Sequence, residues 1–405
     1  MRLAKGKRAL VIGGSMSGLL AALALERHGW RADVYERVAE PLAGRGAGIV
    51  AQPELKAILR ALGLDADRDL GIEVTTRVMF ARDGRVTHRV PIAQTMTAWD
   101  RVFHLLKAAL PEANYHRGKE LRRVERRGQG VVAHFADGSS EEGDVLIGAD
   151  GIRSTVRQQY LPEVAPLYAG YTAWRGLIAE SAFPPALHAD LFEDFSFCLP
   201  PNEQMLGYPV AGPDNDLRPA HRRYNFVWYR PASEEHELPR LLTDDSGCAH
   251  LLSIPPPLIA RDVIAAMRAG AERVLAPQFN EMVGLCAQPF LQPIYDLEVP
   301  RMAFGRVAIL GDAAFVARPH VGAGVAKAAE DALALAQALD ASGNVEVALN
   351  QYEQARIPAG ERIIARARHL GAYVQADLKT EAEREYAARH RTPEAVLAET
   401  AMMDF

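Results

Sequence analysis

The sequence predicts an α/β fold in which a parallel-sheet domain is interleaved with an antiparallel-sheet domain and followed by C-terminal helices. Three observations support this prediction. A buried strand, a glycine-rich bend, a helix and a second strand follow one another within residues 8–36. Segments of alternating polarity interrupt this pattern at 72–95 and 168–230. A further buried strand meets a glycine at 305–314, and two helical segments follow it.

The first unit shows the βαβ order most clearly. Residues 9–12 form a short apolar run, and residues 32–36, ADVYE, form a second. Between them, leucines at helical spacing predict a helix that ends near Gly29. Two strands joined by a helix imply a parallel sheet, because only a crossover connection returns the chain in the same direction.

Turn residues and periodicity predict the remaining elements. They are a hairpin within 72–95 that turns at Asp83-Gly84, a helix over 100–110 that stops at Pro111, a hairpin that turns at Asp137-Gly138, a buried strand over 145–148, a helical stretch over 259–286 and helices over 324–340 and 345–372.

The composition excludes several classes of function. With 405 residues the chain is long enough for two domains or one large composite. A net charge of -5 gives no electrostatic basis for binding nucleic acid or an anionic membrane. No run approaches the roughly 18 apolar residues of a spanning helix. The basic-then-apolar start runs directly into Gly13 without a cleavage pattern, which indicates a strand rather than a signal peptide.

The cysteines indicate a reducing compartment. The three cysteines are odd in number and far apart, and they form no C-x-x-C pair. This pattern is typical of reduced thiols in a cytoplasmic protein, and it predicts no metal site.

The bend after the first strand matches a dinucleotide-binding fingerprint except at one position. Gly13 and Gly18 occupy the first and third glycine positions of G-x-G-x-x-G, but Ser15 replaces the second glycine. The fingerprint places a pyrophosphate at the start of the helix and an acidic residue on a ribose about 20 residues later. Glu36 meets the second requirement. A glycine-rich turn in some other α/β protein is the alternative interpretation.

Two further motifs sharpen this interpretation. The segment 143–157 contains the pattern D-G-x-x-S-x-x-R in full, and the segment from 305 onward contains G-D followed by P-x-x-G-x-G. The residues that carry the two patterns are Asp150, Gly151, Ser154 and Arg157, and then Gly311, Asp312, Pro319, Gly322 and Gly324.

Together the three motifs resemble those of class A flavin-dependent aromatic monooxygenases with the para-hydroxybenzoate hydroxylase fold, over about residues 5–372. The segments GGSMSGL, GIVAQPEL, YAGYTAWRG and RPHVGAGVAKA resemble the branch that hydroxylates dihydroxypyridines, in which the G-G-S form also occurs. The resemblance implies FAD as cofactor, NADH or NADPH as a transient co-substrate, O2 as oxidant and, by analogy, a homodimer. NADH is preferred by analogy alone, and no second dinucleotide fingerprint is present.

The resemblance also implies a division of the chain. A Rossmann-like FAD-binding domain would comprise residues 1–71, 96–166 and 288–372. An antiparallel-sheet substrate domain would comprise 72–95 and 167–287, and residues 373–405 would form a C-terminal tail.

Most of the candidate cofactor contacts follow from the three motifs. For Arg37 and Arg101 the alternative is a solvated surface charge without a cofactor contact. Gly48 belongs to the segment 44–50, whose flexible backbone would approach the flavin ring. The expected contacts are Gly13, Ser15, Ser17 and Gly18 with the pyrophosphate, Glu36 with the ribose, Arg37 near the adenine, Arg101 with the ribityl chain or phosphates, Asp150 within the second motif, Asp312 with the ribityl hydroxyls, and Gly322, Gly324 and Val325 with the O2 and N1 edge of the flavin.

The family reaction gives the substrate residues their expected roles. Hydride from the nicotinamide reduces FAD, O2 then forms a flavin C4a-hydroperoxide, and an electron-rich hydroxylated ring attacks its distal oxygen. We expect His320 to act as a base or hydrogen-bond partner, although a structural histidine is an equal alternative. The expected substrate contacts are Pro319, Tyr171, Trp174, Arg175, Tyr224, Phe226 and Trp228; the last three could also be core, and Arg175 could pair with a substrate anion or form a structural ion pair.

Other functions remain as alternatives on the same scaffold. A tailoring monooxygenase that acts on a larger natural product or a flavin-dependent reductase would share these motifs. The halogenase signature W-x-W-x-I-P is not present. A flavin sensor without turnover fits the aromatic middle segment poorly, and a membrane quinone hydroxylase lacks support because residues 376–405 are rich in Glu and Arg.

Overall fold

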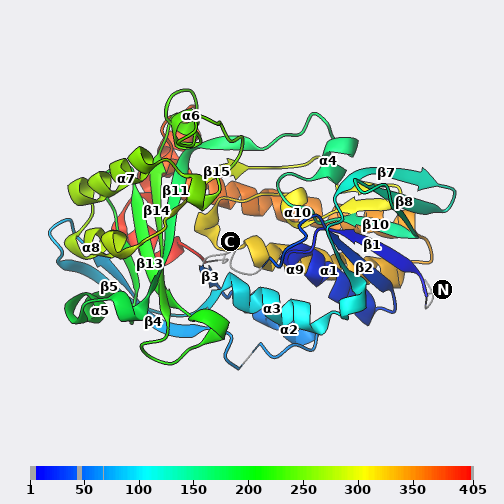
Figure 1. The fold of residues 1–405 in the computed structure, drawn as a ribbon, viewed down its shortest axis with the longest axis horizontal. Helices are drawn as coiled ribbons and strands as arrows, with labels where there is room; N and C mark the ends of the chain where they lie inside the picture. Colours follow the sequence, from blue (N-terminus) through cyan, green and yellow to red (C-terminus); the bar gives the residue numbers. More distant parts are fainter. Residues whose placement is uncertain (1–5, 43–47, 67, 403–405) are drawn as a thin grey trace.

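The computed structural model describes residues 6–42, 48–66 and 68–402. The chain forms two lobes that lie side by side (Figure 1). One lobe is built on a six-stranded, mostly parallel sheet, and the other on an eight-stranded mixed sheet. A separate three-stranded antiparallel sheet completes the first lobe. The fold class predicted from the sequence is confirmed.

The parallel sheet has the strand order β16-β17-β10-β1-β2-β6. Its strands are β1 (Arg8–Ile12), β2 (Arg31–Glu36), β6 (Tyr115–Arg117), β10 (Val145–Gly148), β16 (Ala303–Phe304) and β17 (Val307–Ile309), of which β16 alone runs antiparallel to its neighbour. The helices of this lobe are α1 (Met16–Arg27), α2 (Pro53–Ala61), α3 (Trp99–Ala109), α4 (Thr155–Tyr160), α9 (Gly324–Ala341) and α10 (Val345–Gly371). The small sheet contains β7 (Leu121–Arg127), β8 (Gly130–Phe135) and β9 (Ser140–Gly143).

The eight-stranded sheet has the order β15-β11-β14-β13-β12-β4-β5-β3. Its strands are β3 (Gly48–Val50), β4 (Ile72–Phe80), β5 (Val86–Ala98), β11 (Leu167–Ala179), β12 (Phe195–Cys198), β13 (Gln204–Val210), β14 (Arg223–Pro231) and β15 (Phe290–Asp296). Helices α5 (Pro185–Leu191), α7 (Arg261–Val274) and α8 (Pro277–Leu285) cover one face, and α6 (Glu237–Leu241) lies nearby. Helices α11 (Glu381–His390) and α12 (Pro393–Glu399) contribute to the core on the opposite face.

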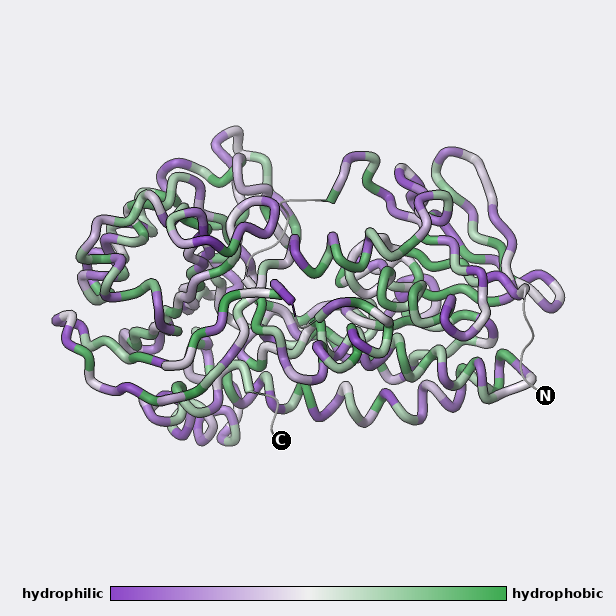
Figure 2. The backbone as a smooth tube through the Cα atoms, turned by 90° about the horizontal axis from the view of Figure 1, so that it is seen from below, coloured by the Kyte–Doolittle hydropathy of each residue, from purple (hydrophilic) through white to green (hydrophobic). Residues whose placement is uncertain are grey.

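Burial follows the two sheet types. Strands β1 and β10 are buried almost throughout, as expected of parallel strands covered on both faces. Helix α1 is apolar all round because it packs against both the sheet and helix α9. In Figure 2, hydrophobic stretches run through the interior of the parallel-sheet lobe, and hydrophilic stretches concentrate on the loops at its edge.

The division of the chain between the lobes differs from the predicted boundaries at three places. Residues 48–50 and 290–296 were expected in the cofactor domain, but they pair into the eight-stranded sheet as β3 and β15. Residues 381–399 were expected as a tail, but they form two helices with buried apolar side chains. The strand partners of residues 48–50 and 290–296 are distant in the sequence and leave no local signal there, which explains the first two differences. Among the described residues, no helix has the length and apolar character needed to cross a membrane.

Candidate active site

The glycine-rich bend lies where the order of the parallel strands reverses. Strand β1 pairs with β2 on one side and β10 on the other, so a crevice opens at its carboxyl end. Gly13 has φ +109°, and a Cβ there would lie 2.3 Å from the Ala149 carbonyl oxygen. A Cβ on Gly18 would lie 1.9 Å from the Gly13 carbonyl oxygen. Both glycines are therefore required by close backbone approach.

Ser15 precedes helix α1 as its N-cap, but its side chain makes no capping hydrogen bond. The backbone N–H groups of the first helical turn carry the positive end of the helix dipole. The Ser15 hydroxyl therefore remains available to a ligand beside those groups.

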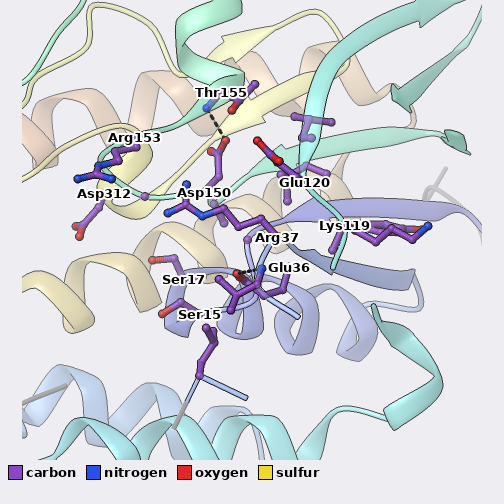
Figure 3. Close-up of a pocket in the computed structure, with 18 of the residues that line it drawn as sticks. Ser15, Ser17, Glu36, Arg37, Lys119, Glu120, Asp150, Arg153, Thr155 and Asp312 are labelled. Carbon is purple, nitrogen blue, oxygen red and sulfur yellow. Dashed lines mark hydrogen bonds between the residues drawn. The ribbon is translucent and has the colours of Figure 1, made fainter. Parts of the chain in front are cut away.

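A cavity of about 380 Å³ occupies this crevice. Figure 3 shows that its polar side chains come from the carboxyl ends of several parallel strands, from the loops that follow them and from the first turns of α1 and α4. The predicted cofactor residues that line it are Gly13, Ser15, Ser17, Glu36, Arg37, Asp150 and Asp312.

Two carboxylates in this cavity are fixed by backbone N–H groups. Glu36 is buried and accepts hydrogen bonds from the N–H groups of Gly14 (2.8 Å) and Val38 (2.9 Å). One oxygen of Asp150 accepts from the N–H of Thr155 at 2.8 Å (Figure 3), whereas its buried Oδ1 has no partner among the residues that the structure describes. Desolvation by burial raises the pKa of Asp150. An orphaned acceptor of this kind calls for a donor from a ligand.

The second motif ties this cavity to the third motif. Ser154 caps helix α4 by accepting from the Arg157 N–H. The buried Arg157 guanidinium donates to the Ala313 carbonyl (3.1 Å) and to the Ile152 carbonyl (2.6 Å). Arg157 therefore holds the loops after β10 and β17 in register.

Asp312 lines this cavity and also a second one of about 250 Å³. Its carboxylate faces the cleft, and desolvation by the surrounding protein raises its pKa. The preceding Gly311 has φ +62° and donates its N–H to Asp331 at 3.1 Å, while its carbonyl accepts from Lys327 Nζ at 2.9 Å. Lys327 and Asp331 are buried supports that no motif in the sequence indicated.

The second cavity also contains the start of helix α9. Gly322, Gly324 and Val325 line it, and Gly322 adopts φ +64°, a conformation that favours glycine. The N–H groups at this helix start favour negative charge on a ligand. The two cavities share Asp312, and each contains the N-terminal end of a helix, α1 in one and α9 in the other. Their residues therefore fit an extended dinucleotide whose flavin ring would lie against Gly322 and Gly324.

Arg37, Gly48 and Arg101 differ in how they lie relative to the two cavities. Arg37 is exposed at the edge of the first cavity. Gly48 lines the second cavity, whereas residues 43–47 of the predicted flexible segment lie outside the described residues. Arg101 is half-buried on α3 and lines neither cavity, although its Nε has no hydrogen-bond partner in the described part of the chain. A cofactor role for Arg101 stays a prediction.

His320 lies in the wall of the second cavity but is not placed as a free base. It is buried, with Nδ1 2.9 Å from Gln204 Oε1 and Nε2 3.1 Å from the Tyr171 hydroxyl. Burial, with the charges of Arg318 and Arg175, lowers the pKa of His320 to about 3. A neutral ring with both nitrogens engaged favours the alternative of a structural histidine over a base, and a catalytic role for His320 stays a prediction.

The aromatic residues predicted to contact substrate divide between the two faces of the eight-stranded sheet. Trp174, Tyr224, Phe226 and Trp228 pack in the core beneath α5, α7 and α8, on the face away from the cavity. Their assignment as substrate contacts was wrong, because side chains alternate between faces along a strand. Tyr171 is fully buried behind His320. Arg175 and Pro319 line the cavity.

The same alternation brings other side chains into the cavity. Tyr229 follows Trp228 on β14, and Tyr208 lies on the neighbouring β13. Gln292 on β15 and the pair Thr400 and Ala401 after α12 complete this part of the wall. The YNFVWYR alternation could have indicated Tyr229 once the direction of the faces was known. No sequence signal marked Thr400 or Ala401.

Comparison with known proteins shows the family to which the chain belongs. Residues 294–367 match a family model described as FAD binding domain, and residues 168–296 match one described as FAD binding domain-like. The chain is 32% identical over 368 residues to 2,6-dihydroxypyridine 3-monooxygenase of Paenarthrobacter nicotinovorans, with 91% of each chain covered. The chain belongs to the flavin-dependent aromatic monooxygenases.

Members of this family with other substrates are also similar to the chain. One is 6-hydroxynicotinate 3-monooxygenase of Pseudomonas fluorescens, 28% identical with 89% of this chain and 90% of the relative covered. The solved structure of 2,6-dihydroxypyridine-3-hydroxylase from Arthrobacter nicotinovorans matches with a TM-score of 0.85 and 31% identity, covering 93% of this chain and 95% of the other. As a flavin-dependent aromatic monooxygenase, the chain is an oxidoreductase with FAD as its cofactor.

Proposed function

We propose that this monooxygenase hydroxylates a small hydroxylated heteroaromatic ring, a hydroxypyridine in the first instance, with NADH or NADPH as reductant. One oxygen atom of O2 enters a ring C–H bond. The other leaves as water, with two electrons and a proton from the reduced nicotinamide and a second proton from solvent. The proposal draws its substrate class from the relatives and its mode of recognition from the cavity beside Gly322.

FAD would supply the two-electron reduction and the reaction with O2, and the protein supplies binding, orientation and electrostatics. Glu36, Asp150 and Asp312 offer carboxylate acceptors for hydroxyl groups of the cofactor. The N–H groups at the start of α9 would stabilise negative charge on the ring edge that faces them.

Arg175 is the observation that carries the substrate assignment. Arg318 also lines the cavity, but it is paired with Asp296 at 2.9 Å. Arg175 forms no ion pair with a carboxylate among the described residues, and its buried Nε has no hydrogen-bond partner. A half-buried guanidinium that faces a cavity without a counter-ion favours an anionic ligand.

An ionised ring hydroxyl meets this requirement. The cation stabilises the oxyanion and so lowers the pKa of the bound hydroxyl. The ionised ring is more electron-rich and is the better nucleophile toward oxygen. Burial raises the pKa of Tyr229 to about 12, so its hydroxyl stays neutral and can act as a donor beside the ring.

The proposal is tested by following NADH and NADPH oxidation by the FAD-loaded protein, with hydrogen peroxide counted in parallel. The ring panel comprises 2,6-dihydroxypyridine, hydroxynicotinates and hydroxybenzoates. We expect a hydroxypyridine to accelerate oxidation at least about tenfold with little peroxide. Absence of stimulation by every hydroxypyridine would contradict the proposal.

The variant Arg175→Gln tests the recognition step. Loss of the cation should raise KM for the ring about tenfold to a hundredfold, because a charge-assisted hydrogen bond contributes roughly 1.5–3 kcal/mol. It should also move the acidic limb of the kcat/KM profile to higher pH, since the ring hydroxyl would ionise less readily. Arg230→Gln is the matched control, because Arg230 pairs with Glu203 and lines neither cavity. Equal effects in both variants would remove Arg175 from the proposal.

A further inference from the structure

Residues 392–402, here called the closing segment, reach the active-site cavity from the far end of the chain. Within this segment, helix α12 packs against β4 and β5 of the eight-stranded sheet. Thr400 and Ala401, which follow the helix, are buried and line the same cavity as Arg175 and Gly322. The cavity therefore has a wall made by residues about 80 positions from the third motif.

Ala401 is tied to three other parts of the chain. Its N–H donates to the His320 carbonyl at 2.7 Å, and its carbonyl accepts from the side-chain amides of Gln52 (2.9 Å) and Gln94 (3.2 Å). The residue has φ +55°, which an alanine adopts only where surrounding contacts require it. This local geometry is built by the fold and is unlike a frayed chain end.

Gly322 contacts the closing segment and also lines the cavity in which the flavin edge is expected. A Cβ at Gly322 would lie 2.9 Å from the Ala401 Cβ and 3.0 Å from its Cα. The loop that is expected to hold the flavin edge thus contacts Ala401 directly.

A buried arginine anchors the middle of the segment. Arg77 is fully buried, and its guanidinium donates to the Leu397 carbonyl at 2.6 Å and to Gln94 Oε1 at 2.5 Å. Desolvation lowers its pKa to about 10, and none of its contacts is a carboxylate. The negative end of the α12 dipole also stabilises the positive charge of Arg77 beside the last carbonyls of this helix. Burying the Arg77 guanidinium costs free energy that only its hydrogen bonds offset. The bond to the Leu397 carbonyl therefore fixes the position of α12.

Thr400 continues the same network toward His320. Its hydroxyl accepts from Gln204 Nε2 at 3.4 Å, and Gln204 Oε1 lies 2.9 Å from His320 Nδ1. Gln204 therefore links the closing segment to the loop beside the cofactor site.

We propose that the closing segment is the inner wall of the active site, and that Thr400 and Ala401 determine the size of ring that the cavity admits. The small Ala401 side chain leaves room for the ring. The anchored segment keeps water away from the face of the cavity next to Gly322. The part concerning the ring rests on the proposed function, whereas the part concerning water does not.

The first experiment changes the size of the wall. Binding of 2,6-dihydroxypyridine to the FAD-loaded, full-length protein is measured from the change in flavin absorbance. Ala401→Leu should weaken binding about tenfold or more, because added carbons overfill a packed site. The control is Ala398→Leu, the same substitution at an exposed position of the segment, which should change binding less than about twofold. Unchanged binding by Ala401→Leu would overturn the role in ring size.

The second experiment loosens the wall without touching the cavity. Quenching of bound FAD fluorescence by iodide is compared in the wild type, Arg77→Met and the control Arg89→Met, which alters an exposed arginine on the same hairpin. Arg77→Met should raise the quenching constant about threefold, whereas Arg89→Met should leave it unchanged. If Arg77→Met does not fold, Arg77→Lys replaces it, with about a twofold rise expected.

The two experiments separate the two claims. Equal quenching in the arginine variants and the wild type would overturn the wall. If no ring perturbs the flavin spectrum of the wild type, the proposed function fails, whereas the quenching comparison still supports or overturns the wall.

Discussion

At the scale of single residues, burial determines what His320 can do. Burial and the positive charges of Arg318 and Arg175 disfavour its protonation, and both ring nitrogens already have partners. A histidine inside a P-x-x-G-x-G motif invites assignment as a base. In the structure its ring instead contacts Tyr171 and Gln204, and its backbone carbonyl accepts a hydrogen bond from the Ala401 N–H.

The lowered pKa of His320 has a measurable consequence for stability. In the unfolded chain its pKa is near 6.5, so between pH 6.5 and 3 the unfolded state binds a proton that the folded state does not. Stability is therefore lost as pH falls through this window. From pH 7 to pH 5 the wild-type apoprotein should lose about 2 kcal/mol more than His320→Gln, measured by urea unfolding. Equal losses would show that His320 protonates in the folded state.

At the scale of elements, the start of helix α1 explains the serine in the dinucleotide fingerprint. Gly13 and Gly18 are required by backbone contacts, whereas Ser15 occupies a position with room for a side chain whose hydroxyl faces the cavity. A hydroxyl there can donate to a phosphate oxygen.

Ser15→Ala should weaken FAD binding about fivefold to tenfold, which corresponds to one hydrogen bond of roughly 1 kcal/mol. The Tm of the apoprotein should hardly change, because the hydroxyl makes no cap bond in the protein itself. Fluorescence titration of the apoprotein with FAD measures the affinity. A fall in apoprotein Tm with unchanged affinity would assign Ser15 to the fold alone.

Directly after β11, Glu180 is held by a buried arginine and a histidine. Glu180 accepts from the Arg222 guanidinium at 2.8 and 3.0 Å, and His188 Nε2 lies 2.8 Å away. Burial opposes ionisation, but the bonds from Arg222 and His188 prevail and lower the pKa of Glu180 to about 2. Since the unfolded value is near 4.5, this contribution is present above pH 4.5 and lost as pH falls toward 2.

Glu180→Gln should therefore cost about 2 kcal/mol of unfolding free energy at pH 7 and clearly less at pH 3. Glu193→Gln is the control, because Glu193 contacts the same arginine but is exposed, and it should cost less than about 1 kcal/mol. Chemical denaturation at both pH values measures the difference. A cost that is independent of pH would contradict the assignment of the pKa.

At the scale of the whole molecule, most of the predicted cofactor residues line one of the two cavities, whereas most of the predicted substrate residues are packed in the core. Gly13, Asp150 and Asp312 each follow a parallel strand, and parallel strands bring their carboxyl ends to one edge. A glycine or an acidic residue directly after a buried strand can be recognised from the sequence itself. Its meaning does not depend on distant neighbours.

The substrate wall depends on distant neighbours at every position. Alternation along β14 placed Tyr224 and Trp228 on one face, but only the helices packed on that face reveal that it is the core. Tyr229 on the other face was missed for the same reason. The pairing of β3 and β15 and the docking of Ala401 on His320 join segments that share no motif.

The two lobes meet around the cavity that contains Arg175, Gly322 and Ala401, where we propose that the ring is hydroxylated. The most direct test supplies 18O2 to the FAD-loaded protein with NADH and 2,6-dihydroxypyridine, followed by mass spectrometry of the ring product. We expect one 18O atom from O2 in each hydroxylated ring and none from labelled water. Ring oxygen derived from water, or consumption of NADH and O2 that yields peroxide without a hydroxylated hydroxypyridine, would contradict it.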